Sequence, residues 1–179
     1  MRTALLLSMI LISPLKVQGT AIDYDYDIDM HGESFLMTQD TYCMALNIYH
    51  ESRSENLAGK FAVADVVVNR LNDRRYPNTI CGVIYDAELK PSWKDPTKEV
   101  PVRNRCQFSW YCDGKPDEPT EQDAWNESIL VAHQLIFEGR MEGITEGATH
   151  YHTTYVEPYW ATSLELKATR LERSVEYFK

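Results

Sequence analysis

The chain has 179 residues, the usual length of a single domain, and a formal net charge of −9. Hydrophobic residues make up 44% of it and charged residues 25%, as in ordinary globular proteins, which excludes a largely disordered chain. The negative charge argues against nucleic-acid binding, because phosphates would repel the protein. It also provides no long-range attraction to an anionic polymer, so recognition of such a polymer would have to be local.

The first residues are predicted to form an export signal. Residues 1–19 combine a basic start, a mainly apolar run and a small-residue cleavage site at Val17-Gln18-Gly19. An uncleaved membrane anchor is the weaker alternative, since the apolar run is shorter than the roughly 20 residues of a spanning helix. Cleavage would remove Arg2 and Lys16 and change the net charge from −9 to −11. We therefore expect an exported monomer, in the periplasm or cell wall, with no stable membrane insertion after cleavage.

Residues 20–37 are predicted to be an acidic linker. Aspartates alternate with other residues from Asp23 to Asp29, but the glycine and terminal glutamate of a calcium-binding loop are missing. The folded domain should then span residues 38–179.

That domain is predicted to be α+β, mainly helical, with a small β-sheet or hairpin. Apolar residues at helical spacing predict helices over 38–52, 57–71 and 79–86, and a fourth from a cap at Thr120 to Gly139. Thr38 is the expected cap of the first helix. The proline-rich residues 87–119 are predicted to be a long functional loop. Residues 145–155 alternate polar and aromatic side chains, which indicates a short strand or hairpin.

The four cysteines suit two disulfides in an exported chain. Three pairings exist, and we predict Cys43–Cys81 with Cys106–Cys112, because the last two cysteines bracket one loop. A zinc site is the alternative, but the sequence has no Cys-x-x-Cys spacing.

Residues 50–55 (His-Glu-Ser-Arg-Ser-Glu) are the densest cluster of candidate catalytic groups. Glu51 and Glu55 would share a helix face if the helix continued, although solvated charges at a helix end would look the same. A metalloprotease motif would need a second histidine where Ser54 stands, and no Gly-x-Ser-x-Gly occurs for a serine hydrolase. A glycosidase acid needs one carboxyl kept protonated by burial, and Glu51 follows Tyr49 at the end of an apolar helix.

Three ordered blocks add to this. The first contains Glu51-Ser52-Arg53-Ser54-Glu55, Gly59, Ala62-Val63-Ala64, Asn69-Arg70, Pro77-Asn78 and Val83-Ile84-Tyr85. The second is Gln107-Phe108-Ser109-Trp110 with Asp113-Gly114, and the third is Gly147-Ala148-Thr149-His150-Tyr151-His152 with Pro158 and Trp160. Together they resemble the SleB-type cell wall hydrolase family, which includes spore cortex-lytic enzymes. Ser52 and Ser54 stand where that family has alanine and glycine, and its histidine near the end of the domain is missing.

The resemblance implies a lysozyme- or transglycosylase-like fold. It also implies an enzyme that cleaves peptidoglycan glycan strands without a cofactor. Glu51 corresponds to the catalytic residue of a lytic transglycosylase acting between N-acetylmuramic acid and N-acetylglucosamine. It would protonate the glycosidic oxygen and then accept the proton of the muramoyl C6 hydroxyl, giving 1,6-anhydromuramoyl ends. The alternatives are a hydrolytic muramidase with Glu55 or Asp113 as base, a non-catalytic wall-binding protein, and a metal-dependent peptidase or amidase.

The predicted substrate-binding residues are Glu55, Gln107, Ser109, Trp110, Asp113 and Tyr151. The two aromatic residues are candidates for stacking on sugar rings, with core packing as the alternative. Asp113 could equally make a turn with Gly114, and Glu55 could be a partner of Arg53. His150 and His152 should lie on one face of a strand and pack there or form hydrogen bonds, since no third metal ligand is evident.

Overall fold

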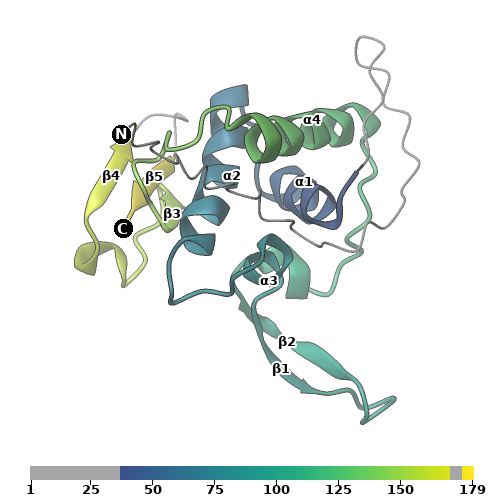
Figure 1. The fold of residues 1–179 in the computed structure, drawn as a ribbon. Helices are drawn as coiled ribbons and strands as arrows, with labels where there is room; N and C mark the ends of the chain where they lie inside the picture. Colours follow the sequence, from purple (N-terminus) through teal and green to yellow (C-terminus); the bar gives the residue numbers. More distant parts are fainter. Residues whose placement is uncertain (1–36, 170–174) are drawn as a thin grey trace, which may run out of the picture.

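The computed structural model describes residues 37–169 and 175–179 (Figure 1). The signal predicted at 1–19 and the linker predicted at 20–37, apart from Met37, lie outside the described residues. The described part is a mixed α and β domain, as predicted. A group of helices carries a three-stranded sheet on one side, and a two-stranded hairpin projects from it (Figure 1).

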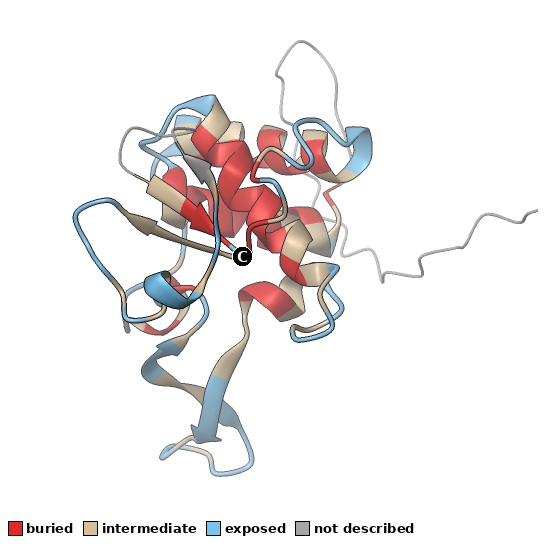
Figure 2. Ribbon diagram, turned by 90° about the vertical axis from the view of Figure 1, so that its left-hand side faces the viewer, coloured by how far each residue is buried: buried red, intermediate tan, exposed pale blue. Residues whose placement is uncertain are grey.

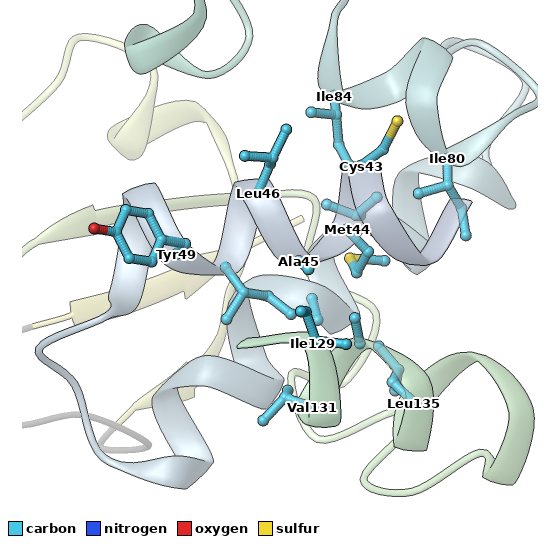
Figure 3. Packing of buried hydrophobic residues seen from close by; sticks show 14 of the residues in the cluster. Cys43, Met44, Ala45, Leu46, Tyr49, Ile80, Ile84, Ile129, Val131 and Leu135 are labelled. Atoms are coloured by element: carbon cyan, nitrogen blue, oxygen red, sulfur yellow. The ribbon is translucent and has the colours of Figure 1, made fainter. Parts of the chain in front are cut away.

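Helix α1 (Gln39–Ser52) is the central element, and it begins where the sequence predicts. The hydroxyl of Thr38 accepts a hydrogen bond from the Thr41 N–H at 3.1 Å, which caps the helix, and Asp40 lies in the first turn. Most of the α1 side chains are buried, because other helices pack around it. In Figure 3, Ile80 and Ile84 lie on one side of α1, and Ile129 and Leu135 lie on another. This enclosure fixes the direction in which the last turn of α1 points.

Three further helices pack around α1. Helix α2 (Leu57–Leu71) is capped by Asn56, and the short helix α3 (Ile80–Ile84) is capped by Thr79. Helix α4 (Gln122–Glu138) ends at Gly139, whose φ of 63° is the left-handed conformation that favours glycine.

The predicted Thr120 cap of α4 is wrong. The residue that caps the helix is Glu121, and its side chain makes no capping hydrogen bond. The backbone N–H groups of Thr120 and Glu121 instead both donate to the hydroxyl of Tyr49, each at 3.1 Å. The chain entering α4 is therefore held by α1, which a local sequence pattern does not reveal.

Residues 87–119 are also not the long loop that we predicted. Strands β1 (Ala87–Pro91) and β2 (Glu99–Cys106) form an antiparallel hairpin, which is followed by the 3-10 helix η1 (Ser109–Cys112). The prolines are compatible with it because each strand of a two-stranded ribbon has a free edge. Most residues of the hairpin are exposed, so it lacks the alternation of buried and exposed residues that predicts a strand (Figure 2).

The predicted strand within 145–155 is β3 (His150–Thr153), but its partners come from the end of the chain. Strand β5 (Val175–Phe178) lies between β3 and β4 (Leu166–Thr169), and both pairings are antiparallel. The 3-10 helix η2 (Ala161–Ser163) lies in the connection between β3 and β4. A local hairpin at 145–155 is therefore excluded.

Both predicted disulfides are present. Cys43–Cys81 joins α1 to α3, and Cys106–Cys112 closes the short loop that contains η1. Each bridge thus fixes a segment next to α1 or next to the hairpin.

Removal of the smaller disulfide should cost a modest amount of stability. In a Cys106→Ser/Cys112→Ser variant we expect the free energy of unfolding to fall by about 2 kcal/mol, because the bridge closes a loop of only a few residues. Urea denaturation of the variant and the wild type measures this. A Cys43→Ser/Cys81→Ser variant should lose more, since that bridge spans a separation of 38 residues. The reverse order would contradict the prediction.

The described residues contain neither a membrane span nor a group of metal ligands. None of the helices among them is long and apolar enough to cross a membrane. In the same residues, no three His, Cys, Asp or Glu side chains are grouped as metal ligands would be.

Candidate active site

Glu51 lies in the last turn of α1 and is half-buried. Its neighbour Ser52 points into the protein and donates its hydroxyl to the Ile48 carbonyl oxygen at 2.9 Å. The helix ends at Ser52, so Glu55 falls in the following turn and does not share a helix face with Glu51. Glu51 is therefore placed by a largely buried helix, as a rigid catalytic group requires.

Two hollows meet at Glu51. The acidic hollow, of about 520 Å³, is lined by Tyr49, His50, Glu51, Arg53, Ser109, Trp110, Asp113, Lys115, Pro116, Asp117, Glu118 and Thr120. The arginine hollow, of about 380 Å³, is lined by Glu51, Arg70, Cys106, Gln107, Phe108, Ser109, His150, Tyr151 and Trp160. Of the residues that the structure describes, only Glu51 and Ser109 line both hollows, so a chain-like ligand could pass from one to the other beside the Glu51 carboxyl.

A hydrogen bond from β3 orients the carboxyl. The Tyr151 hydroxyl, on β3, donates to Oε2 of Glu51 at 2.9 Å. Because Oε2 accepts this bond, the proton of the neutral acid belongs on Oε1. One oxygen is thus held by the protein and the other is left to transfer the proton.

The surroundings of Glu51 favour its protonated form. Burial raises the pKa of Glu51 above its ordinary value, while the Tyr151 hydrogen bond and the charges of Arg70 and His50 lower it in part. The net direction is upward. A carboxyl that stays protonated at higher pH is what a general acid requires.

Strand β3 is held against α2 by a buried polar cluster. The Asp65 carboxylate accepts hydrogen bonds from the backbone N–H groups of Gly143 (2.7 Å) and Thr145 (3.0 Å) and from the Thr145 hydroxyl. Asn69 donates to Thr145 Oγ1 and to the Ala148 carbonyl oxygen, both at 2.9 Å. These bonds fix the segment that precedes β3, and hence the position of Tyr151.

The histidines of β3 lie on one face, as predicted. His150 and His152 both contact the ring of Trp160, with ring centroids 5.2 and 5.4 Å apart, and His152 also stacks on Phe178. Burial lowers the pKa of His150, and the charges of Arg70 and Arg75 lower it further.

The polar residues predicted to bind substrate are distributed unevenly around Glu51. Ser109 lines both hollows, Gln107 lines the arginine hollow and Asp113 lines the acidic hollow. Asp113 also forms the turn that was its alternative role, accepting from the Lys115 N–H at 2.8 Å. Glu55 is exposed and lines neither hollow. The suggested pairing of Glu55 with Arg53 is wrong, because Arg53 pairs with Glu121 at 3.0 Å.

The two aromatic candidates are not open platforms. Trp110 is only 7% exposed, stacks on His50 with ring centroids 4.6 Å apart, and donates its indole N–H to Asn47 at 3.0 Å. Tyr151 uses its hydroxyl for Glu51. Their positions fit the core-packing alternative better than free stacking surfaces.

Two residues beside Glu51 had no predicted role. His50 donates from Nε2 to the Asp117 carbonyl oxygen at 2.9 Å, and this bond ties the end of α1 to the wall of the acidic hollow. Arg70 is buried in the wall of the arginine hollow. A signal for Arg70 was present, because Asn69-Arg70 belongs to the first of the three blocks that resemble the family.

Comparison with known sequences gives the family. The family described as Cell Wall Hydrolase matches residues 54–175, more than half of the chain. The protein belongs to the cell wall hydrolase family. The matched range begins three residues after Glu51 and contains Arg70, Ser109 and Tyr151.

Curated members are similar over a shorter stretch. Spore cortex-lytic enzymes from Bacillus cereus and from Bacillus subtilis (strain 168) are 45% and 40% identical to this cell wall hydrolase over 47 residues. These matches cover 26% of this chain but only 18% and 15% of the two relatives. The chain thus matches less than a fifth of each relative's length.

Solved structures match over most of the chain. The catalytic domain of the germination-specific lytic transglycosylase SleB from Bacillus anthracis aligns with a TM-score of 0.55 and 23% identity, covering 83% of this chain and 98% of that domain. The catalytic domain of the Bacillus cereus SleB protein aligns with a TM-score of 0.52 and 22% identity, covering 78% and 89%. These likenesses establish that the cell wall hydrolase shares their fold.

Proposed function

We propose that this protein cleaves the glycan strands of peptidoglycan as a lytic transglycosylase, with Glu51 as both acid and base. The observation that carries the proposal is the Glu51 carboxyl, half-buried where two hollows meet and held through one oxygen by Tyr151. Membership of the cell wall hydrolase family supports the substrate class. The likeness to the Bacillus anthracis domain, which comes from a germination-specific lytic transglycosylase, supports the reaction type.

The proposed reaction needs no second carboxylate. Glu51 transfers the proton on Oε1 to the glycosidic oxygen between N-acetylmuramic acid and N-acetylglucosamine, and the bond breaks with departure of the glucosamine hydroxyl. The Glu51 carboxylate then accepts the proton of the muramoyl C6 hydroxyl, which attacks C1 and closes a 1,6-anhydro ring. Because the attacking hydroxyl belongs to the substrate, it is already close to C1. The acid is regenerated at the end of the cycle.

The solvent-accessible polar residues would bind the strand. Ser109 and Gln107 are exposed and line the hollows, so they are suited to hydrogen bonds with hydroxyl or acetamido groups. The acidic hollow carries His50, Arg53 and Lys115 among its acids, which offers both donors and acceptors to a sugar.

One observation favours a hydrolytic muramidase as the second candidate. Asp113 lines the same hollow as Glu51, and a hydrogen bond from the Lys115 backbone N–H lowers the pKa of its carboxyl. An ionised carboxylate there could act as a base for a water molecule. Glu55 is less suited to that role, since it lines neither hollow.

Digestion of purified peptidoglycan followed by mass spectrometry tests both candidates. Products that end in 1,6-anhydromuramic acid are expected for the lytic transglycosylase. Products with reducing muramic ends would instead indicate a hydrolytic muramidase. In that case the Asp113→Asn variant should no longer form them. If the folded protein releases neither glycan fragments nor peptides, a non-catalytic wall-binding role is the remaining choice. Release of peptides alone, abolished by a chelator, would indicate a metal-dependent peptidase or amidase.

The site of action is part of the same proposal. We propose that the protein is exported to the periplasm or cell wall, is cleaved near residue 19 and acts as a monomer. Two disulfides are consistent with an oxidising compartment. N-terminal sequencing of the protein recovered from the periplasm or medium would test the cleavage.

Removal of the Tyr151 hydroxyl should reduce the activity of Glu51 without abolishing it. A Tyr151→Phe variant removes only the hydroxyl that donates to Glu51 Oε2. We expect kcat to fall by about tenfold to a hundredfold, the usual effect of a lost hydrogen bond to a charged group. The high-pH limb of the rate profile should move to higher pH, because this bond lowers the pKa of Glu51. Tyr155→Phe, at an exposed tyrosine, is the control, and equal effects of the two variants would refute the role.

A further inference from the structure

Arg70 is a buried cation in helix α2. Its residue is 5% exposed, its Nε donates to the Thr149 carbonyl oxygen at 2.8 Å, and its Nη1 is buried with no hydrogen-bond partner. In the part of the chain that the structure describes, no carboxylate forms an ion pair with it. Burying an unpaired guanidinium is costly, so its presence needs an explanation.

Aromatic rings hold the guanidinium in place. Its central carbon lies 5.4 Å from the centroid of the Tyr76 ring and 5.0 Å from that of Phe108. With the bond to Thr149, these contacts fix the charge in the wall of the arginine hollow, which Glu51 also lines. A guanidinium stays charged even when it is buried, so the positive charge persists in this wall.

We propose that Arg70 is a positioning residue for Glu51, whose fixed positive charge stabilises the Glu51 carboxylate once the acid has given up its proton. Oε2 is already held by Tyr151, so the charge that develops on release of the Oε1 proton lies beside the same hollow as a cation that is itself held in place. The low dielectric of the wall strengthens this attraction. The inference rests on the proposed function for its catalytic meaning, but the electrostatic effect can be measured without substrate.

Arg70 acts against burial in setting the proton affinity of Glu51. Burial raises the pKa of Glu51, and the charge of Arg70 lowers it. Glu51 must first donate a proton and later accept one. It benefits from the opposing effects of burial and of Arg70, because neither the protonated nor the ionised carboxyl becomes too stable. Among the described residues that line the two hollows, the other titratable and charged groups are Tyr49, His50, Arg53, Asp113, Lys115, Asp117, Glu118, His150 and Tyr151.

The test is an NMR titration of Glu51 in the full protein labelled with 13C at the glutamate carboxyl carbon. The Glu51 signal is identified by its absence in a Glu51→Gln variant. In Arg70→Met we expect the titration midpoint to rise by on the order of one pH unit, as when a nearby opposite charge is removed. Arg70→Lys should restore most of the wild-type midpoint. Arg53→Met is the matched control, because Arg53 is exposed and already paired with Glu121, so its loss should leave the midpoint in place.

Thermal denaturation first establishes that each variant is folded. If Arg70→Met is not, Arg70→Gln replaces it, because a glutamine is neutral but polar. A midpoint that does not change in a folded Arg70→Met or Arg70→Gln overturns the inference, whatever the protein does to peptidoglycan. A raised midpoint supports it, and the high-pH limb of glycan cleavage should then move in the same direction. A raised midpoint in a protein that releases no glycan fragments would overturn the proposed function alone.

Discussion

A Glu51→Gln variant should lose at least about a thousandfold in the rate of glycan release, as expected for removal of a general acid. Glutamine keeps the size of the side chain and can still accept a hydrogen bond from Tyr151 through its amide oxygen. It cannot donate a proton to the glycosidic oxygen or take one from the C6 hydroxyl. Quantifying soluble fragments released from purified peptidoglycan measures the effect. Glu55→Gln is the matched control, because Glu55 is exposed and lines neither hollow.

The same variant should not be destabilised. Burial raises the pKa of Glu51 in the folded state, so the folded protein binds the Glu51 proton more tightly than the unfolded chain does. The stability linked to this group is fully present below the unfolded pKa and is lost as the pH rises through the folded pKa. The neutral glutamine avoids that loss. Glu51→Gln should therefore unfold at no lower urea concentration than the wild type at neutral pH. Lost activity with lost stability would point to a structural role.

The enclosed helices were predictable because their signals are local. Thr38 caps α1 and Gly139 ends α4 as the sequence indicates, since caps and apolar spacing depend on residues within a few positions. The same pattern placed Glu51 at the end of an apolar helix. It could not place the Tyr151 hydroxyl on Oε2, because that contact joins residues 100 positions apart.

The incorrect predictions concern elements that lack a local signal or depend on residues far apart in the sequence. Most residues of the hairpin formed by β1 and β2 are exposed. Its sequence therefore lacks the alternation of apolar and polar residues that marks a half-buried strand. The start of α4 depends on the Tyr49 hydroxyl, and β3 pairs with a strand from the end of the chain. Arg70 could have been singled out as a charged residue close to the apolar run Val66-Val67-Val68, but its relation to Glu51 requires the fold.

An Asp65→Ala variant should lose about 3–5 kcal/mol in the free energy of unfolding, among the largest effects of a single substitution. Asp65 is fully buried and accepts from two backbone N–H groups and one hydroxyl in the segment before β3. Alanine leaves these buried donors without an acceptor, and each such loss is costly. The free energy of unfolding of Asp65→Asn should lie between those of the wild type and Asp65→Ala, because the asparagine amide keeps one accepting oxygen. Urea denaturation measures all three proteins.

Glycan release should fall as well, since the segment held by Asp65 leads into the strand that carries Tyr151. The matched control is Asp73→Ala, whose carboxylate pairs with the exposed Arg75 on the surface, and which should leave both stability and activity near the wild type. The fall in activity should exceed the unfolded fraction, because a displaced Tyr151 no longer orients Glu51 in molecules that remain folded. If Asp65→Ala is as stable as Asp73→Ala, the cluster does not hold β3 in place. If activity falls only with the unfolded fraction, the position of Tyr151 does not depend on Asp65.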